Sequence, residues 1–316
     1  MSGLSAVFWK ELADHFNSKR FIILALLVYL AGTATIYVAA QNIRGGITES
    51  TQFIFLRLFI VSGETLPFSF PFFMALFVPI IGIALGFDAI NSERTSGTLS
   101  KLLSQPVYRD SVINGKFLAG LVTLAVLVFS IVALVAGMGL RMIGVPPNAE
   151  EILRIFAFIF VSIIYGAFWM SLAILFSIFF NRTATSALAS IALWIFLFLF
   201  MPMIARIIAG SVFPVDQNSS LALLVQHDNL YRALNHLSPN ALYGEAVQAL
   251  LLPELSTTSE IMMMISIYGA GMMPTPLPLS QSLLLVWPQL TSLIALTALC
   301  FAISYIRFMR EEIRST

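Results

Sequence analysis

The sequence predicts an all-α integral membrane protein, a bundle of six transmembrane helices in one domain that covers residues 1–316. Of the 316 residues, 59% are hydrophobic and 10% are charged, whereas soluble domains average about 45–50% apolar and about 25% charged residues. A bilayer core of about 30 Å needs roughly 20 mostly apolar residues per helix, and the chain has six charge-free runs of that kind. Helices are expected because an open strand in lipid would leave backbone polar groups unpaired. Short alternating strands, typical of a transmembrane barrel, are not found in the sequence.

Residues 1–20, before the first run, predict an amphipathic helix that lies in the membrane interface. Apolar residues recur there at helical spacing, and they are Leu4, Val7, Phe8, Leu12 and Phe16. Polar residues occupy the other faces, and they are Lys10, Glu11, Asp14 and Asn17. A solvated tail is the alternative.

The six apolar runs predict the transmembrane helices. They are residues 21–40, 68–87, 117–140, 155–180, 185–205 and 283–306. The first run is longer than the apolar stretch of about 7–15 residues in a signal peptide, so we expect it to be a retained anchor.

Two segments outside these runs are expected on the outer side of the membrane. Residues 53–62 are too short to span and carry Arg57, which predicts an interfacial helix or an extension of the second span; a seventh, irregular membrane element is a further alternative. Residues 209–282 are too apolar for a free linker, and Ser238-Pro239 suits the start of a helix. Short helices that cap the bundle are expected in this segment.

Small residues mark expected contacts between helices. Gly82 and Gly86 form a GxxxG pattern in the second span, and Ser186 and Ser190 form a similar pair in the fifth. These pairs allow close backbone approach, either within one subunit or between two. In the second span, Pro71 and Pro79 are both expected to kink the helix.

The distribution of Lys and Arg predicts that both termini lie in the cytoplasm. With that orientation the cytoplasmic cations are Lys10, Lys19, Arg20, Arg94, Lys101, Arg109, Lys116, Arg182, Arg307, Arg310 and Arg314. The smaller outer set is Arg44, Arg57, Arg141, Arg154, Arg206 and Arg232. Of these, Arg154 and Arg206 lie just beyond the outer ends of predicted helices, so their side chains are expected to reach the lipid headgroups by snorkelling.

Sequence patterns of catalysis and metal binding are missing. No span carries Asp, Glu, His or Lys in its middle, which argues against a proton-coupled transporter. The HExxH, GxSxG and GxxxxGK[ST] motifs do not occur, so we expect no catalytic residues and no nucleotide site in this chain. We expect no metal site either, because the histidines are not spaced as ligands and the methionines at 262–264 and 272–273 suit apolar packing better than Cu(I).

The cytoplasmic loop of residues 88–116 predicts a short docking helix. Gly97 can interrupt the helix that descends from the second span, and Thr98 is a suitable N-cap for the next helix. Apolar residues then recur at i, i+3 and i+4 until Pro106, and they are Leu99, Leu102 and Leu103. Such a helix between two membrane helices can dock in a groove of a cytoplasmic partner and convert its movement into helix tilt. A loop that only reconnects two spans would need fewer residues and no apolar face.

Several motifs resemble the type 2 ATP-binding-cassette (ABC) export permeases, most closely the multi-purpose bacterial and archaeal permeases that include the copper-enzyme maturation type. The loop carries the strongest likeness, in residues 93–99 (ERTSGTL), 102–106 (LLSQP), Arg109 and Gly115-Lys116. Other matching stretches are residues 9–12, 18–20, 180–184 and 237–240. The resemblance therefore runs over most of the chain.

The resemblance implies a permease subunit without its own ATPase site, in the inner or plasma membrane of a prokaryote. It implies two separate ATPase subunits that bind ATP and Mg²⁺, a second permease copy or a paralogue, and contact with membrane lipids but not with nucleic acid. The coupling residues would be Glu93, Gly97, Thr98, Leu99, Leu102, Leu103, Gln105 and Pro106. Hydrophobic or amphipathic cargo is expected. The alternative is a non-transporting transmitter that passes ATPase-driven motion to an extracytoplasmic protein docked on residues 209–282.

Overall fold

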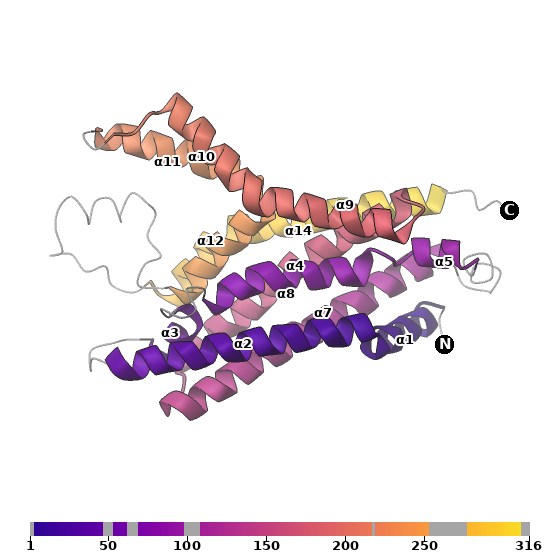
Figure 1. The fold of residues 1–316 in the computed structure, drawn as a ribbon, viewed down its shortest axis with the longest axis horizontal. Coiled ribbons are helices and arrows are strands. Elements are labelled where there is room, and N and C mark those ends of the chain that lie inside the picture. The colour runs from indigo at the N-terminus through magenta and orange to yellow at the C-terminus, as the bar shows by residue number, and fades with distance from the viewer. Residues whose placement is uncertain are drawn as a thin grey trace.

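A computed structural model shows the protein as an elongated helical bundle (Figure 1). It describes residues 3–46, 53–61, 69–97, 108–216, 219–252 and 277–310. Within these ranges, all regular structure is helical and six helical segments are long and apolar enough to cross a membrane. These spans are Lys19–Ile43, Phe70–Thr95, Arg109–Ile143, Ala149–Phe179, Thr183–Val212 and Leu279–Arg310. They confirm the six predicted helices, and all six are longer than the charge-free runs because the helices continue beyond those runs.

The first half of the chain builds one side of the bundle. The helices are α1 (Gly3–Asn17), α2 (Lys19–Gly46), α3 (Ile54–Ile60), α4 (Phe70–Gly86), α5 (Asn91–Thr95) and α7 (Arg109–Ile143). The interfacial helix expected before the first span is α1, which packs along the start of α7. Within residues 53–61, Ile54–Ile60 form α3, a separate short helix as one of the predicted alternatives has it, and its apolar side chains pack into the bundle.

The second half contains α8 (Ala149–Phe179), α9 (Thr183–Ile195), a π-helical turn η1 (Phe196–Phe200), α10 (Met201–Val212), α11 (Leu221–Asn235), α12 (Pro239–Leu251) and α14 (Leu279–Arg310). The fifth span consists of α9, η1 and α10. Ser238 precedes Pro239 at the start of α12, as the sequence predicts. Helix α12 packs on α8 and α14, whereas α11 packs on α10 and projects with it away from the other helices (Figure 1). The expectation that the helices after the fifth span all cap the bundle is therefore wrong for α11.

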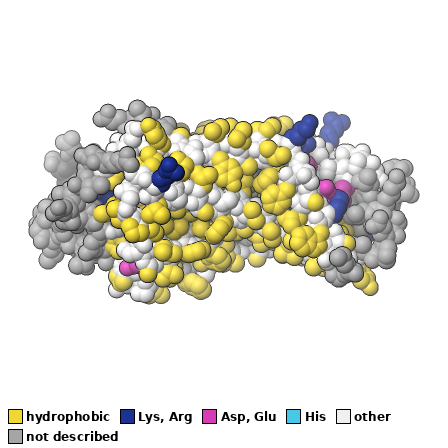
Figure 2. Space-filling view, turned by 90° about the horizontal axis from the view of Figure 1, so that it is seen from below, with side chains coloured by type: hydrophobic (Ala, Val, Ile, Leu, Met, Phe, Trp, Pro, Cys, Tyr) yellow, Lys and Arg dark blue, Asp and Glu magenta, His cyan; other side chains and the backbone are white. Residues whose placement is uncertain are grey.

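Helix α8 forms the centre of the core. It packs against α4, α7, α12 and α14, and its side chains Phe158, Tyr165 and Trp169 are fully buried. The outer helices instead expose apolar side chains, such as Leu26 of α2, Leu199 of η1 and Leu284 of α14. Figure 2 shows hydrophobic side chains along the length of one face, with charged groups toward its ends. This pattern suits a molecule whose surface lies against lipid.

The structure corrects one expectation about a proline and one about an arginine. Pro71 lies in the first turn of α4, where its missing N–H removes no helical hydrogen bond, so only Pro79 lies in the helix interior. Arg154 does not snorkel. Its side chain is fully buried near the start of α8, and it is held there by several hydrogen bonds described below.

Candidate functional site

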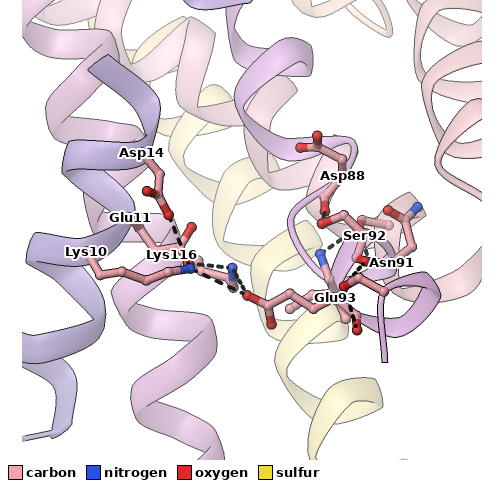
Figure 3. Close-up of polar contacts among 11 residues, drawn as sticks. Lys10, Glu11, Asp14, Asp88, Asn91, Ser92, Glu93 and Lys116 are labelled. Carbon is pink, nitrogen blue, oxygen red and sulfur yellow. Dashed lines mark hydrogen bonds and ion pairs between the residues drawn. The ribbon is translucent and has the colours of Figure 1, made fainter. Parts of the chain in front are cut away.

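Four charged side chains form a cluster at the end of the bundle that holds α1 and α5, and we call Lys10, Glu11, Glu93 and Lys116 the ion cluster (Figure 3). Lys116 Nζ of α7 lies 2.7 Å from Glu11 Oε1 of α1 and 2.8 Å from Glu93 Oε1 of α5. Lys10 Nζ lies 2.9 Å from Glu11 Oε1 and 3.9 Å from Glu93 Oε1. The ion cluster therefore joins three helices whose charges are far apart in the sequence.

The ion cluster is shielded from solvent around Lys116. The side chains of Lys116, Glu11 and Glu93 are 7%, 11% and 13% exposed. Burial alone would raise the pKa of Glu11, but the charge and hydrogen bond of Lys116, together with Lys10, hold that pKa below its ordinary value. Removal of one charge would leave its partners desolvated without compensation, which typically costs about 3–5 kcal/mol for a fully buried pair.

Local packing brings α1 against the start of α7 beside the ion cluster. Gly115 allows this approach: a Cβ at this position would lie 2.8 Å from Cγ1 of Val7. Val7 is buried there, one helical turn from Glu11. The Gly115-Lys116 pair thus provides both the close contact and the charge that reaches Glu11.

The start of the cytoplasmic loop is also attached to α8. The hydroxyl oxygen of Ser177 accepts hydrogen bonds from the backbone N–H groups of Ile90 and Asn91, at 2.9 and 3.1 Å. Arg94 donates to the carbonyl of Ile178 at 3.3 Å and to Oδ1 of Asn181 at 3.2 Å. Helix α5 is therefore attached to α8 by hydrogen bonds and to α1 and α7 by the ion cluster.

A cavity of about 250 Å³ lies beside the ion cluster, between α1, α2 and the end of α4. Its rim includes the ion pair of Arg20 and Asp88, whose Nη1 and Oδ2 atoms lie 2.7 Å apart. Its apolar wall includes Phe21 and Leu85. His15 lines the same cavity, and burial lowers its pKa. At neutral pH this histidine is therefore held in the uncharged form.

The predicted coupling residues are described only in part. Glu93 belongs to the ion cluster, and Gly97 has a left-handed φ of +67°, which ends the helical path after α5 as the sequence predicts. The remaining predicted coupling residues lie outside the described part of the chain, and they are Thr98, Leu99, Leu102, Leu103, Gln105 and Pro106.

The predicted packing residues lie inside the subunit. A Cβ on Gly82 would be 2.5 Å from the carbonyl oxygen of Gly166, and one on Gly86 would be 2.5 Å from that of Met170. The GxxxG pair thus lets α4 lie directly on the backbone of α8. Ser186 and Ser190 are both buried in α9, which packs on α8 and α4, and the Ser190 hydroxyl donates to the Ser186 carbonyl at 2.9 Å.

A second polar cluster, which the sequence did not indicate, lies at the opposite end of the bundle. Arg154 donates to Glu150 Oε1 at 2.7 Å, to the Leu250 carbonyl at 2.9 Å and to Ser282 Oγ at 3.1 Å. It also donates to the carbonyl of Leu277. Arg154 therefore ties α8 to the end of α12 and the beginning of α14. The only sequence signal was a cation close to an apolar run, which lipid-facing arginines share.

The neighbouring Glu151 holds α3 in place. Its Oε1 accepts hydrogen bonds from the backbone N–H groups of Phe55 and Leu56, at 3.0 and 3.3 Å. Its Oε2 accepts from the N–H of Asn148, whose side chain in turn accepts from the N–H of Glu151. One carboxylate thus completes a capping box on α8 and satisfies two of the free donors at the start of α3.

Comparison with known proteins identifies the family to which this chain belongs. A family model described as ABC-2 family transporter protein matches residues 5–313. The chain belongs to this family. This ABC-2 permease is 24% identical over 234 residues to the probable ABC transporter permease protein NosY of Pseudomonas aeruginosa. The aligned region covers 72% of this chain and 78% of that relative. Membership confirms the resemblance seen in the loop, and ABC permeases work with ATPase subunits.

Proposed function

We propose that this ABC-2 permease is the transmembrane subunit of an exporter, and that residues 88–116 pass the movement of two separate ATPase subunits to the bundle. The observation that carries the proposal is the attachment of α5 to three other helices. Glu93 contacts Lys116 of α7, which also binds Glu11 of α1, and Ser177 of α8 receives two N–H groups from the start of α5. A force on the loop would reach α1, α7 and α8 at once.

The direction of this force follows from how α5 is connected. Helices α4 and α5 belong to one candidate span, Phe70–Thr95, so a push on α5 would also act along α4. Because Gly82 and Gly86 seat α4 on the backbone of α8, the two helices have little room to slide independently. The loop would thus tilt α4, α7 and α8 relative to the lipid-facing helices α2, α9 and α14.

The cargo is proposed to be hydrophobic or amphipathic. A second cavity, of about 320 Å³, lies between α4, η1 and α12, and side chains such as Phe72, Phe198 and Val247 make its wall mainly apolar. Asn240 and Gln248 add polar groups to the same wall. Apolar pockets with few polar groups suit lipid-like, peptide or drug-like molecules better than small ions.

The assembly is proposed to contain two ATPase subunits and a second permease, which is either a copy of this chain or a paralogue. Its ATPases bind ATP and Mg²⁺ on the side of α1 and α5, which would be the cytoplasm of a prokaryotic cell. Eleven lysines and arginines were assigned to that side from the sequence, and α1, α5 and the end of α14 all lie at one end of the bundle (Figure 1). Both termini would then be cytoplasmic.

A non-transporting transmitter is the second candidate, and the position of α10 and α11 favours it. These helices project from the end opposite α1 (Figure 1), where an extracytoplasmic protein can reach them. In that arrangement the same ATPase strokes would move a docked partner and no cargo would cross the membrane.

Co-purification with the neighbouring ATPase tests the coupling role. Leu102→Asp with Leu103→Asp would place two charges in an apolar contact, so we expect the permease to lose the ATPase while it remains folded. Leu221→Asp is the control, because Leu221 is 37% exposed and begins α11, which projects from the end of the bundle opposite α1 (Figure 1). Glu93→Gln should keep the ATPase bound but reduce the stimulation of ATP hydrolysis by the permease.

Two outcomes separate the alternatives. Retention of the ATPase by the Leu102/Leu103 variant would remove the docking role of the loop. In proteoliposomes, ATP-dependent movement of a fluorescent phospholipid or hydrophobic dye supports export. ATP hydrolysis without such movement, accompanied by a distance change between spin labels on α11 and α12, supports the transmitter.

A further inference from the structure

The fifth span contains a helical irregularity whose cause lies in the sequence. The turn η1 has π-helical spacing, and the N–H of Met201 donates to the carbonyl of Phe196, five residues earlier. In this spacing the carbonyl of Leu197 would receive the N–H of residue 202. That residue is Pro202, which has no N–H group. The helix itself therefore leaves the Leu197 carbonyl without its backbone donor.

Ser238 supplies a donor to this carbonyl. Its hydroxyl oxygen lies 2.8 Å from the carbonyl oxygen of Leu197, although 41 residues separate them in the sequence. Ser238 is fully buried, and it occupies the N-cap position of α12 without capping that helix through its side chain. Serine at an N-cap normally accepts a hydrogen bond from its own helix. Here the hydroxyl is directed to the fifth span instead.

We infer that Ser238 is a positioning residue that holds the outer part of the fifth span through the carbonyl that Pro202 leaves free. Inside a membrane, water cannot satisfy such a carbonyl, and side-chain hydroxyls of neighbouring helices take its place. The bond joins η1 to the start of α12, and α12 packs on α8 and α14 in the core. The projecting pair α10 and α11 is thereby attached to the core at the point where the helix is irregular. The inference holds for either proposed function, because it concerns how this pair is positioned.

The turn is suited to bending at this point. A π-helical turn with proline beside it lacks one bond of the regular helical ladder, which is a common cause of helix kinks. Phe198 of η1 and Asn240 of α12 both line the 320 Å³ cavity, so a change in the angle between η1 and α12 would also change its width. Ser238 therefore sets both the direction of α10 and the distance between two walls of this cavity.

A double-mutant cycle between Ser238 and Pro202 tests the inference. Ser238→Ala should shift and broaden the distance between spin labels placed on α10 and α14, and it should lower the melting temperature. Pro202→Ala restores an N–H group that can reach Leu197, so Ser238→Ala should have little further effect in that background. Additive effects of the two substitutions, on distance and on melting temperature alike, would overturn the inference.

Matched variants separate the hydroxyl from simple packing. Threonine and valine have nearly the same shape, and both add a methyl group at this buried position, but only threonine can donate a hydrogen bond. Ser238→Thr should keep the label distance of the wild type, whereas Ser238→Val should shift it as Ser238→Ala does. Equal distances in the threonine and valine variants would show that the donor has no positioning role. The same samples in nanodiscs need no cargo and no ATPase, so this result is independent of the test of the proposed function.

Discussion

Lys116 is the cation that pairs with both carboxylates of the ion cluster. It is the least exposed charge of the four, and it lies between two carboxylates that belong to different helices. An ammonium group has three donors, so it can serve Glu11 and Glu93 at the same time. Since each carboxylate binds the same nitrogen, displacement of α5 changes the electrostatic environment of α1 directly.

Acidification should destabilise the protein in two stages. Burial lowers the pKa of His15, and the charge of Lys116 lowers it further. Glu11, Asp14 and Asp88 raise it, but the pKa in the folded state still lies below the ordinary value of 6.5, so the imidazole is neutral. The unfolded chain therefore binds more protons below pH 6.5, and stability falls as the pH drops through that range. The pKa of Glu11 is also lowered, so its stabilisation is complete above its ordinary value of 4.5 and is lost as the pH falls further. Melting temperatures in detergent between pH 8 and pH 4, about the range in which these groups titrate, measure both stages.

Single substitutions show which residue causes each of the two stages. His15→Asn should remove the decrease that begins near pH 6.5, and Glu11→Gln should remove the lower one and cost about 1.5–3 kcal/mol at neutral pH. Asp14→Asn is the control for Glu11→Gln, because Asp14 is 62% exposed and such surface pairs contribute about 0–1 kcal/mol. A wild-type melting temperature that stays constant down to pH 4, below the ordinary value of 4.5 for Glu11, would contradict this account of both residues.

At the residue scale, the sequence singled out Glu93 and Lys116 in the loop but not their contacts. Glu93 and Lys116 belong to the loop motifs, whereas Glu11 was assigned to a solvent-facing side of its helix. Periodicity places a residue on a face, and the contact with α7 that buries that face arises only from tertiary packing. Arg154 was misassigned for the same reason, because its acceptors are carbonyls far away in the sequence.

At the element scale, the contact of α4 with α8 is the tightest part of the bundle. A side chain on Gly82 would meet the Gly166 carbonyl oxygen at 2.5 Å and the Met170 nitrogen at 3.1 Å. Both neighbours are backbone atoms, which cannot turn away as a flexible side chain can. The backbone of α4 is regular helix at Gly82, so its own conformation does not require glycine there. Glycine is needed because α8 lies so close.

Gly82→Ala should separate α4 from α8 and destabilise the protein by about 1–3 kcal/mol, the usual cost of overpacking. Gly137→Ala in α7 is the matched control, because no atom lies within 4 Å of the added Cβ. There, alanine should be neutral or stabilise the helix by about 0.5–1 kcal/mol. Thermal unfolding of both variants in the same detergent measures the difference, and equal melting temperatures would refute the role of Gly82.

The elements themselves were largely predictable. Six apolar runs give six spans because a membrane-spanning helix must be apolar over its whole length, which leaves a strong local signal. A short helix at residues 53–62 was one expected alternative, and short helices were expected after the fifth span. The packing of α3 and the projection of α11 were not predicted, since they depend on Glu151 and on α10, respectively. The π-helical turn did leave a signal in Pro202, but the spacing of its bonds and the partner of Leu197 follow only from the structure.

On the scale of the whole molecule, the two ends of the bundle differ in chemistry. The end with α1 and α5 carries the ion cluster and the ion pair of Arg20 with Asp88. The opposite end is held by Arg154 and by Glu151, which bind mostly backbone groups. Ion pairs thus join helices at the end proposed to receive force, and backbone contacts anchor the other end.

Cysteine labelling measures the orientation of these ends. On a Cys300→Ser background, Leu221→Cys at the start of α11 should react with an impermeant maleimide added to intact cells, and Tyr108→Cys should react only after permeabilisation. Both positions are suitable because Leu221 is 37% and Tyr108 is 82% exposed. The reverse pattern would place α1 outside, and labelling of both positions in intact cells would contradict a bundle with these sites on opposite sides.

The contacts of Arg154 have a consequence for how the protein can diversify. One guanidinium group binds the carbonyl of Leu250 and that of Leu277, so the end of α12 and the residues that precede α14 are held at a single point. The number of residues between these anchors can then change without moving α12 or α14, because the entropy of closing a loop grows only slowly with its length. Relatives can therefore carry longer or shorter insertions at this point. A reporter domain can be inserted at the same point while the membrane helices keep their positions.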